Sequence, residues 1–401
     1  MVNKNGSGFM LNPKTNQREL AYITTVTDAK TLAGYDRVHY VHVLGWWCVA
    51  SKDIQVGDRV IYFEVDSVLP ERDKRFLFMA PRKYRVKTQK MCKVISQGLV
   101  LPVKGFPEIA QCREGDFVTD KLGVTLFDSD LGKPVTKGKV DAFTKAMDRH
   151  KKFFSFPPVK FFMRYRWFRF LMTKIFVKKK DTYSWPEWLT KTNQERVQNV
   201  PVLFEDKKAK WILTEKVDGA STSAWLDEKN VYGVGSHNVV VFHSKNPESK
   251  SIGESGSNVQ SNVWYEQAEH YNLHDVLKRM KEKYELKTVA IQGETYGDGI
   301  QKRTYGMKCG KHDFAVFHIL FNGERVSIPR LVSLCEEFNL PHVHIFHWNS
   351  TLPDTVEDLI AVVDSNKSVI DHGMIEGFVL YSQDGQTSYK CVSPSFLLKY
   401  H

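Results

Sequence analysis

Cysteine is scarce in this chain of 401 residues, and its six cysteines include no Cys-x-x-Cys pair. Cysteines so few and so widely spaced exclude a disulfide-stapled scaffold and a structural zinc site of the usual spacing. The first residues also lack the apolar run of a secretory signal peptide. We therefore expect free thiols in an intracellular, reducing compartment, either the cytoplasm or the nucleus.

Acidic residues are missing from one stretch, Arg149 to Lys180, which holds eleven lysines and arginines interleaved with aromatic residues. The whole chain has a formal net charge of +11, so the remainder sums to about zero. Charges that recur every few positions exclude a membrane-spanning helix. Three explanations stay open: contact with nucleic acid, an interfacial helix on an anionic membrane, or an insertion packed on the neighbouring domain with solvated charges.

The length suits two domains of about 100–200 residues each. Hydrophobic residues make up 42% of the chain and charged residues 26%, so packed cores are expected and global disorder is excluded. We predict an α+β protein with a β-barrel module over residues 1–130, the basic aromatic insertion or linker over 131–184, and a second domain over 185–401.

Short β-rich runs separated by glycine, aspartate and proline fill the N-terminal module, at Ala21–Val26, Val38–Val43, Val60–Val65 and Leu99–Val103. About a hundred residues of this pattern favour a small closed barrel of the oligonucleotide-binding (OB) type. One basic run in this module suits either a phosphate-tracking face or a solvated strand; it comprises Arg82, Lys83, Arg85, Lys87, Lys90 and Lys93.

The second domain opens with an apolar run that ends in Lys216-Val217-Asp218-Gly219. On a strand, Lys216 and Asp218 project to the same side, and Gly219 permits a close turn. A lysine amine held neutral can attack the α-phosphate of a nucleoside triphosphate, while a carboxylate beside it holds Mg²⁺. Alone the motif is weak, because a surface turn with an exposed lysine has the same pattern.

Further motifs follow in an order that adds to this chemistry. They supply carboxylates at strand ends, an aromatic ring for base stacking and a second cation, in the series Ser236-His237-Asn238, Glu294, Phe317, Glu376 and Lys390. Each has an ordinary structural explanation, but all of them together in this order favour nucleotidyl transfer.

This order resembles the covalent nucleotidyltransferase superfamily of ATP-dependent ligases and messenger-RNA capping enzymes, whose first motif is Lys-x-Asp-Gly. The match is best with the RNA ligases in which an OB-type module precedes the transferase domain, and segments such as Gly57–Pro70 and Lys191–Asn199 add to it. The resemblance implies a nucleotidyltransferase domain of antiparallel sheets flanked by helices. DNA ligases and capping enzymes carry their barrel after the last lysine motif, whereas eleven residues follow Lys390 here.

The resemblance also implies roles for individual residues. Lys216 would form the lysyl–AMP, and Asp218, Glu294 and Glu376 would surround a catalytic Mg²⁺ or Mn²⁺. The residues implied in ATP binding are Glu215 at the base edge, Phe317 stacked on adenine, Lys390 on the α-phosphate, and Arg196, Asp218, Gly219 and Asn238. Two positions depart from the family pattern, since His237 stands where an arginine is usual and Val392 where a lysine is common.

The expected function is that of an ATP-dependent RNA ligase that joins a 5′-phosphate to an RNA 3′-hydroxyl, at nicks in duplexes and for RNA repair. The reaction would pass through lysyl–AMP and a 5′-adenylated polynucleotide. We expect RNA or an RNA-containing duplex as the partner, a monomer, no obligate protein partner and no membrane contact. Two alternatives stay open: a nucleic-acid-binding adaptor on an inactive transferase domain, and a guanylyltransferase.

The rest of the second domain is predicted to be scaffold. Apolar spacing predicts a helix over 262–283, and shorter helices over Arg330–Phe338 and Thr355–Val363, the last capped by Asp354. Three alternating histidines suit either a metal site or a partly exposed strand, with the strand favoured; they are His342, His344 and His347.

Overall fold

The computed structural model describes residues 18–128, 133–134, 150, 153, 156–162, 172, 184–237, 239–244 and 262–401. Most of the basic aromatic stretch lies outside these residues; of it, the short helix α3 (Pro157–Phe162) and a few single positions are described. The three explanations of that stretch, and the domain boundaries placed within it, therefore stay predictions. Among the helices of the described residues, none has the length and apolarity to cross a membrane.

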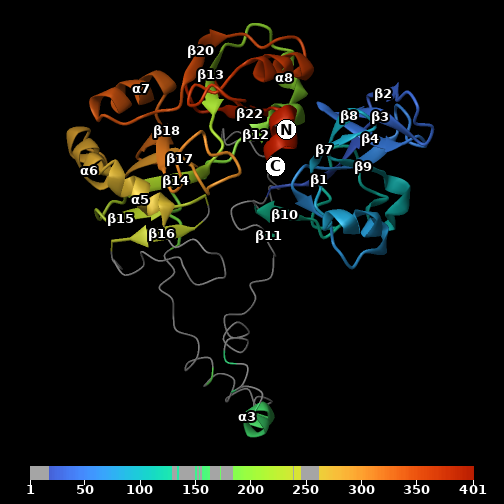
Figure 1. Ribbon diagram of the computed structural model, residues 1–401, viewed down its shortest axis with the longest axis horizontal. Coiled ribbons are helices and arrows are strands. Elements are labelled where there is room, and N and C mark those ends of the chain that lie inside the picture. The colour runs from blue at the N-terminus through green and yellow to red at the C-terminus, as the bar shows by residue number, and fades with distance from the viewer. Residues whose placement is uncertain are drawn as a thin grey trace.

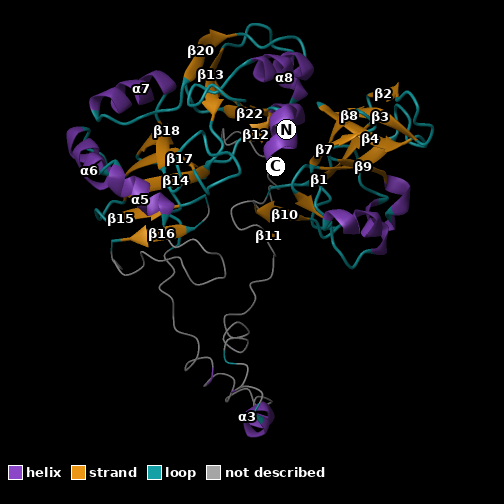
Figure 2. Cartoon of the chain, in the orientation of Figure 1, coloured by secondary structure: helices purple, strands orange, loops and turns teal. Residues whose placement is uncertain are grey.

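Strands dominate the N-terminal module, and the four strands predicted from the sequence are present (Figure 2). The described strands are β1 (Ala21–Thr25), β2 (Asp28–Thr31), β3 (Val38–Val43), β4 (Trp46–Ser51), β5 (Arg59–Phe63), β6 (Ser67–Val68), β7 (Thr88–Met91), β8 (Val94–Gln97), β9 (Leu99–Pro102), β10 (Thr125–Asp128) and β11 (Lys133–Pro134). Short 3₁₀ helices η1 (Lys74–Arg82), η2 (Val103–Gly105) and η3 (Pro107–Ile109) connect them.

The apolar run of β5 explains its central place in the order β1-β5-β9. Its Ile61 and Phe63 enter one hydrophobic cluster, while Val60 and Tyr62 enter a second cluster on the opposite face. Because successive side chains of a strand point to opposite faces, a strand buried on both faces must be apolar throughout. Bonds from β4 to β8 join separate sheets of the module, with Val49 N–H donating to Ser96 Oγ at 3.0 Å.

The C-terminal domain combines two sheets with flanking helices, which confirms the predicted α+β class (Figure 1). Its strands are β12 (Glu195–Arg196), β13 (Trp211–Lys216), β14 (Ala220–Leu226), β15 (Tyr232–Gly235), β16 (Val240–His243), β17 (Val289–Gly297), β18 (His312–Phe321), β19 (Glu324–Arg325), β20 (Ile345–Ser350), β21 (Gly377–Ser382) and β22 (Ser388–Val392). Its helices are η4 (Val197–Asn199), η5 (Pro201–Phe204), α5 (Val263–His270), α6 (Leu273–Lys283), α7 (Ile328–Glu337), α8 (Val356–Ser365) and α9 (Pro394–Tyr400).

The six-stranded sheet has the order β16-β15-β14-β17-β18-β19, and α5, α6 and α7 cover its outer side, away from the N-terminal module (Figure 1). The helix expected over 262–283 is two helices, because Asn272 takes a left-handed conformation with φ of 48° and ends the first of them. The apolar residues at the predicted spacing, Leu277 and Met280 among them, do pack into the core between these helices and the sheet.

The five-stranded sheet has the order β12-β22-β21-β13-β20. The expectation was an antiparallel sheet, but one of its pairings is parallel. The two-residue strand β12 runs parallel to β22 and pairs Arg196 with Lys390. Helix α8 packs on this sheet, and its N-cap is Thr355 rather than Asp354, since the Thr355 hydroxyl accepts the Asp358 N–H at 3.1 Å.

Candidate active site

The chain passes from one sheet to the other at the Lys216–Gly219 motif. Lys216 ends β13 in the five-stranded sheet, and β14 of the six-stranded sheet starts at Ala220. Lys216 is also the register partner of Gly377, which places it beside Glu376 just before β21. The Lys216 Nζ and a Glu376 carboxylate oxygen lie 2.7 Å apart, so two motifs 160 residues apart in the sequence meet here.

Glycine is required at position 219 because the turn presses against β17. A Cβ at this position would lie 2.3 Å from the Thr295 carbonyl oxygen and 2.9 Å from Glu294 Cγ. Real side chains do not approach backbone this closely, so only glycine fits without moving the strand. The turn thereby holds the loop that carries Asp218 against the strand that carries Glu294.

Three carboxylates determine the charge of Lys216. Burial opposes the ammonium form, but Glu376, Glu294 and Asp218 outweigh burial and raise the pKa of the lysine above its usual value. The sequence argument required an amine held neutral; in this structure the lysine is an ammonium paired with Glu376. The reason is that the same carboxylates that suit a metal ion also stabilise a nearby positive charge.

Asp218 is buried and held by groups from distant parts of the chain. Its backbone N–H donates to the Tyr305 hydroxyl at 2.6 Å, and its Oδ1 lies 3.3 Å from His401 Nε2. Its Oδ2 has no hydrogen-bond partner among the described residues. A buried carboxylate oxygen without a partner is costly unless a ligand occupies it, and oxygen is the atom that hard cations prefer.

The described residues do not assemble three histidine, cysteine or acidic side chains into a ready metal-binding group. Asp218, Glu294 and Glu376 act on Lys216, but they are not gathered around one point. Of His342, His344 and His347, the structure places His347 on a strand, β20, whereas His342 and His344 precede it; His342 Nδ1 bonds the Val343 carbonyl at 2.8 Å.

Lys390 lies among other cations at the junction with the N-terminal module. Burial first, and then Arg196, Arg18 and Lys216, lower its pKa to about 7, against the opposing effect of Glu195. Arg196 is 7% exposed and its Nη1 has no hydrogen-bond partner among the described residues. Cations this close together without enough acidic partners indicate a site for an anion.

His237, which replaces the arginine of the family pattern, is neutral. Burial first, and then Lys390, Lys191 and Arg18, lower its pKa to about 4. Its Nδ1 bonds the Thr192 hydroxyl at 3.2 Å. It therefore supplies no positive charge at neutral pH. Asn238 lies outside the described residues.

Glu215 and Phe317 lie near the Lys216–Gly219 motif: Glu215 precedes Lys216 on β13, and Phe317 packs on the apolar cluster that contains Val217. Burial raises the pKa of Glu215, and its Oε2 accepts the Val369 N–H at 3.2 Å. Phe317 is half-buried against a cluster that includes Val217 and Tyr305. The described site residues thus fall into two places. Glu215, Glu376 and Phe317 lie near the Lys216 turn. Arg196 and Lys390 lie near the junction of the modules.

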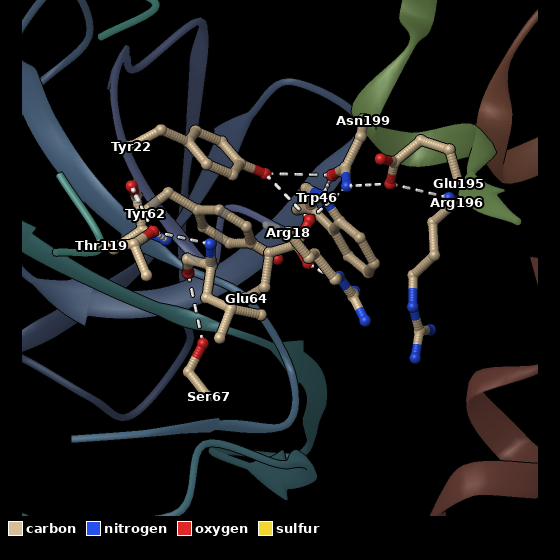
Figure 3. A network of polar contacts seen from close by, with 12 residues as sticks. Arg18, Tyr22, Trp46, Tyr62, Glu64, Ser67, Thr119, Glu195, Arg196 and Asn199 are labelled. Atoms are coloured by element: carbon tan, nitrogen blue, oxygen red, sulfur yellow. Dashed lines mark hydrogen bonds and ion pairs between the residues drawn. The ribbon is translucent and has the colours of Figure 1, made fainter. Parts of the chain in front are cut away.

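A buried polar network fastens the N-terminal module to the C-terminal domain (Figure 3). The Asn199 Oδ1 accepts from Trp46 Nε1 at 2.6 Å and from the Tyr22 hydroxyl at 3.0 Å. Its Nδ2 donates to the carboxylates of Glu64 and Glu195, the latter at 2.6 Å. The Trp46 ring also lies 5.6 Å from the guanidinium of Arg196, so the junction positions a predicted site residue.

Sequence reasoning missed Tyr305, His401, Arg18 and the Asn199 network. Their partners lie far away in the chain; Asn199 and Tyr22, for example, are 177 positions apart. Neither spacing nor composition signals such contacts. The Lys191–Asn199 segment was singled out, but for Arg196 rather than for the amide that joins the modules.

Two family models match the chain: an OB-fold domain over residues 20–103 and an RNA ligase over residues 209–401. Among solved structures, Naegleria gruberi RNA ligase with PPi is 25% identical, with a TM-score of 0.71, covering 95% of this chain and 98% of that one. A lysine-to-methionine mutant of Naegleria gruberi RNA ligase with AMP and Mn is also 25% identical, with a TM-score of 0.72 and coverage of 96% and 99%. No curated protein matches.

Proposed function

We propose that this chain, which matches an OB-fold model ahead of an RNA ligase model, seals RNA through a lysyl–AMP on Lys216. ATP is the nucleotide, and the overall reaction joins a 5′-phosphate to an RNA 3′-hydroxyl at nicks in duplexes, as a repair activity. The observation that carries the proposal is the half-buried Lys216, 2.7 Å from Glu376 and within the field of two further carboxylates.

Residue spacing in the solved relatives supports the choice of residues. Separately mutated forms of the Naegleria gruberi RNA ligase include a lysine and an aspartate two positions apart, and a glutamate and a lysine fourteen positions apart. Lys216 and Asp218 are likewise two positions apart, and Glu376 and Lys390 fourteen (390 − 376). The same residue types at the same intervals favour equivalent roles here.

In the first step the Lys216 Nζ attacks the α-phosphorus of ATP. A P–N bond forms, the P–O bond to pyrophosphate breaks, and its electron pair leaves with pyrophosphate. The ammonium must first lose a proton, and Glu376, whose own pKa is raised by burial, is the carboxylate within reach to accept it. In the second step the 5′-phosphate of the RNA displaces the lysine, and in the third the 3′-hydroxyl displaces AMP.

The residues present fit a divalent cation. The unpartnered, buried Oδ2 of Asp218 is the observation that favours one; Glu294 and Glu376, which are not gathered around the same point, would contribute oxygen ligands through water. When bound, Mg²⁺ or Mn²⁺ would neutralise phosphate charge and compete with Lys216 for these carboxylates, which lowers the lysine pKa. Structures of the relative were obtained with ATP and Mn and with AMP and Mn.

The remaining predicted residues would hold the nucleotide. Phe317 offers a half-buried ring near Val217 for the adenine, and the buried Glu215 lies on the same side for the base edge. Lys390 and Arg196 supply positive charge for the phosphates, and Gly219 and Asn238 complete the proposed set. The partner of the protein is then RNA, held in part by the OB-fold domain.

Covalent labelling tests the proposal. The protein is incubated with Mg²⁺ and α-labelled ATP or GTP, alongside Lys216→Ala and the matched control Lys210→Ala, whose lysine is exposed at the start of the same run. We expect covalent label from ATP, labile to acid and stable to alkali as a phosphoramidate is, that Lys216→Ala loses and Lys210→Ala keeps. Label from GTP alone would identify a guanylyltransferase, and no label from either nucleotide would identify an adaptor.

Sealing assays test the substrate. Nicked duplexes carrying RNA or DNA at each side of the nick are compared with single strands of the same sequence. We expect joining where the 3′-hydroxyl end is RNA and the 5′-end carries a phosphate. Equal joining with a DNA 3′-hydroxyl end would contradict the RNA specificity.

A further inference from the structure

The imidazole of His401 lies beside the Asp218 carboxylate. His401 Nε2 is 3.3 Å from Asp218 Oδ1. This nitrogen is buried and makes no hydrogen bond with the described residues, and the second oxygen of the carboxylate, Oδ2, is likewise buried without a hydrogen-bond partner among them. Buried polar atoms normally have partners. An unsatisfied imidazole nitrogen next to a carboxylate with an unsatisfied oxygen therefore indicates a ligand that binds both side chains.

The backbone of His401 is held from three directions. Its N–H donates to the Leu397 carbonyl of α9 at 3.0 Å. Its backbone oxygen accepts from Lys87 Nζ at 3.1 Å and from Lys302 Nζ at 3.4 Å. Figure 1 shows this end of the chain beside the N-terminal module, which carries Lys87. The imidazole is therefore attached to a fixed backbone.

The start of α9 is fixed to the segment that carries Glu376. The Ser393 N–H donates to the Glu376 carbonyl at 2.8 Å, and the Ser393 hydroxyl caps the helix by accepting the Phe396 N–H at 2.9 Å. His401 also lowers the pKa of Glu376, against the larger effect of burial, so the imidazole is close to that carboxylate as well. One short helix thus leads from the backbone of Glu376 to the side chain of Asp218.

A divalent cation is the ligand that suits an imidazole nitrogen and a carboxylate together. Both groups offer electron pairs, whereas a phosphate would be repelled by Asp218. Metal bonds to such atoms are about 2.0–2.2 Å long, so two neighbouring ligands of an octahedral ion lie about 3 Å apart. The 3.3 Å between His401 Nε2 and Asp218 Oδ1 is close to that separation.

We infer that His401 is a nitrogen ligand of the divalent cation that Asp218 binds. The inference rests on the proposed function and adds to it a ligand and a metal preference. The described residues bring no complete set of three such side chains together, so water and phosphate oxygens would fill the other positions. Because imidazole is a softer ligand than carboxylate or water, the site should bind Mn²⁺ more tightly than Mg²⁺.

Electron spin resonance of bound Mn²⁺ tests the ligand directly, because the nuclear spin of a coordinated nitrogen couples to the unpaired electrons of the metal. The full chain is prepared with natural and with ¹⁵N-labelled histidine and is saturated with Mn²⁺ alone. We expect a ¹⁴N coupling that becomes a ¹⁵N coupling on labelling. His401→Gln should lose it, and the control His347→Gln, which changes an exposed histidine of β20, should keep it.

Calorimetric titration with Mn²⁺ and with Mg²⁺ measures the preference. Loss of the ligand in His401→Gln should weaken Mn²⁺ binding by about tenfold to hundredfold and Mg²⁺ binding by much less. Glutamine keeps an N–H donor, so a histidine that merely held Asp218 by a hydrogen bond would be replaced without this loss. Circular dichroism and thermal unfolding establish that each variant is folded.

The inference is overturned if the unmodified protein binds no Mn²⁺, if no histidine nitrogen couples to the bound ion, or if the coupling persists in His401→Gln. Equal weakening of Mn²⁺ and Mg²⁺ would overturn the metal preference. If ATP gives no label while the coupling depends on His401, the metal ligand stands and the ligase proposal falls. If label forms and no histidine nitrogen couples, the reverse holds.

Discussion

Truncation of Asn199 to alanine tests how strongly the junction joins the two modules. The side chain makes four polar contacts, two as acceptor from Trp46 and Tyr22 and two as donor to Glu64 and Glu195. Hydrogen bonds to charged groups contribute roughly 1.5–3 kcal/mol each and neutral ones roughly 0.5–1.5 kcal/mol. The side chain is buried, so water does not replace the lost partners freely.

Part of this loss is compensated. Glu64 keeps Arg18 as a partner, and the Tyr22 hydroxyl lies 3.5 Å from Glu64 Oε1 and can turn toward it. Glu195 keeps the backbone N–H of Arg196. We therefore expect Asn199→Ala to lower the free energy of unfolding by about 3–5 kcal/mol, less than the sum of four independent bonds.

Urea unfolding and scanning calorimetry measure the effect. Calorimetry is expected to resolve two transitions in the variant, because loss of the shared network uncouples the modules. Asn349→Ala is the control, since Asn349 is exposed on β20, and its effect should stay within about 0.5 kcal/mol. A loss below about 1 kcal/mol for Asn199→Ala, with a single unchanged transition, would refute the view that this amide fastens the junction.

Three further outcomes follow from the site. Gly219→Ala should destabilise the protein by about 1–3 kcal/mol and abolish labelling from ATP, because the added Cβ displaces the Thr295 backbone; full activity would contradict this, and labelling with urea unfolding measures both. Lys390 has a folded pKa of about 7, below its unfolded value, so the unfolded chain binds more protons between pH 7 and 10 and stability rises with pH there. Relative to Lys390→Met, the stability of the unmodified protein should increase by about 1.4 kcal/mol per pH unit over that window, and a flat difference in urea unfolding would be inconsistent with a buried ammonium. Glu376→Gln removes the carboxylate that raises the Lys216 pKa most, so Lys216 should acetylate faster at pH 8, as mapped by mass spectrometry; an unchanged rate would argue against the ion pair.

The sequence predicted the α+β class because that inference depends on local pattern; the site residues chosen from the sequence stay predictions. The β-rich run Val60–Val65 predicted a strand, and β5 is present there, buried on both faces. Of the carboxylates predicted at strand ends, Glu376 directly precedes β21, whereas Glu294 lies inside β17. Spacing alone also placed Asp218 beside Lys216.

The local sequence pattern did not predict two features of the fold: the break between α5 and α6, and the parallel pairing of β12 with β22. The break between α5 and α6 depends on the left-handed conformation of Asn272, which asparagine tolerates but does not require. The parallel pairing of β12 with β22 joins segments nearly two hundred positions apart. Neither feature has a signal in the residues themselves.

Tertiary structure alone decided the charge states and the joining of the modules. Lys216 is an ammonium because three carboxylates from separate segments meet it in a poorly solvated place, and their field exceeds the cost of burial. The same reasoning makes His237 neutral and lowers the pKa of Lys390. A sequence specifies which ionisable groups exist; how strongly they interact depends on distances and burial that only the folded chain establishes.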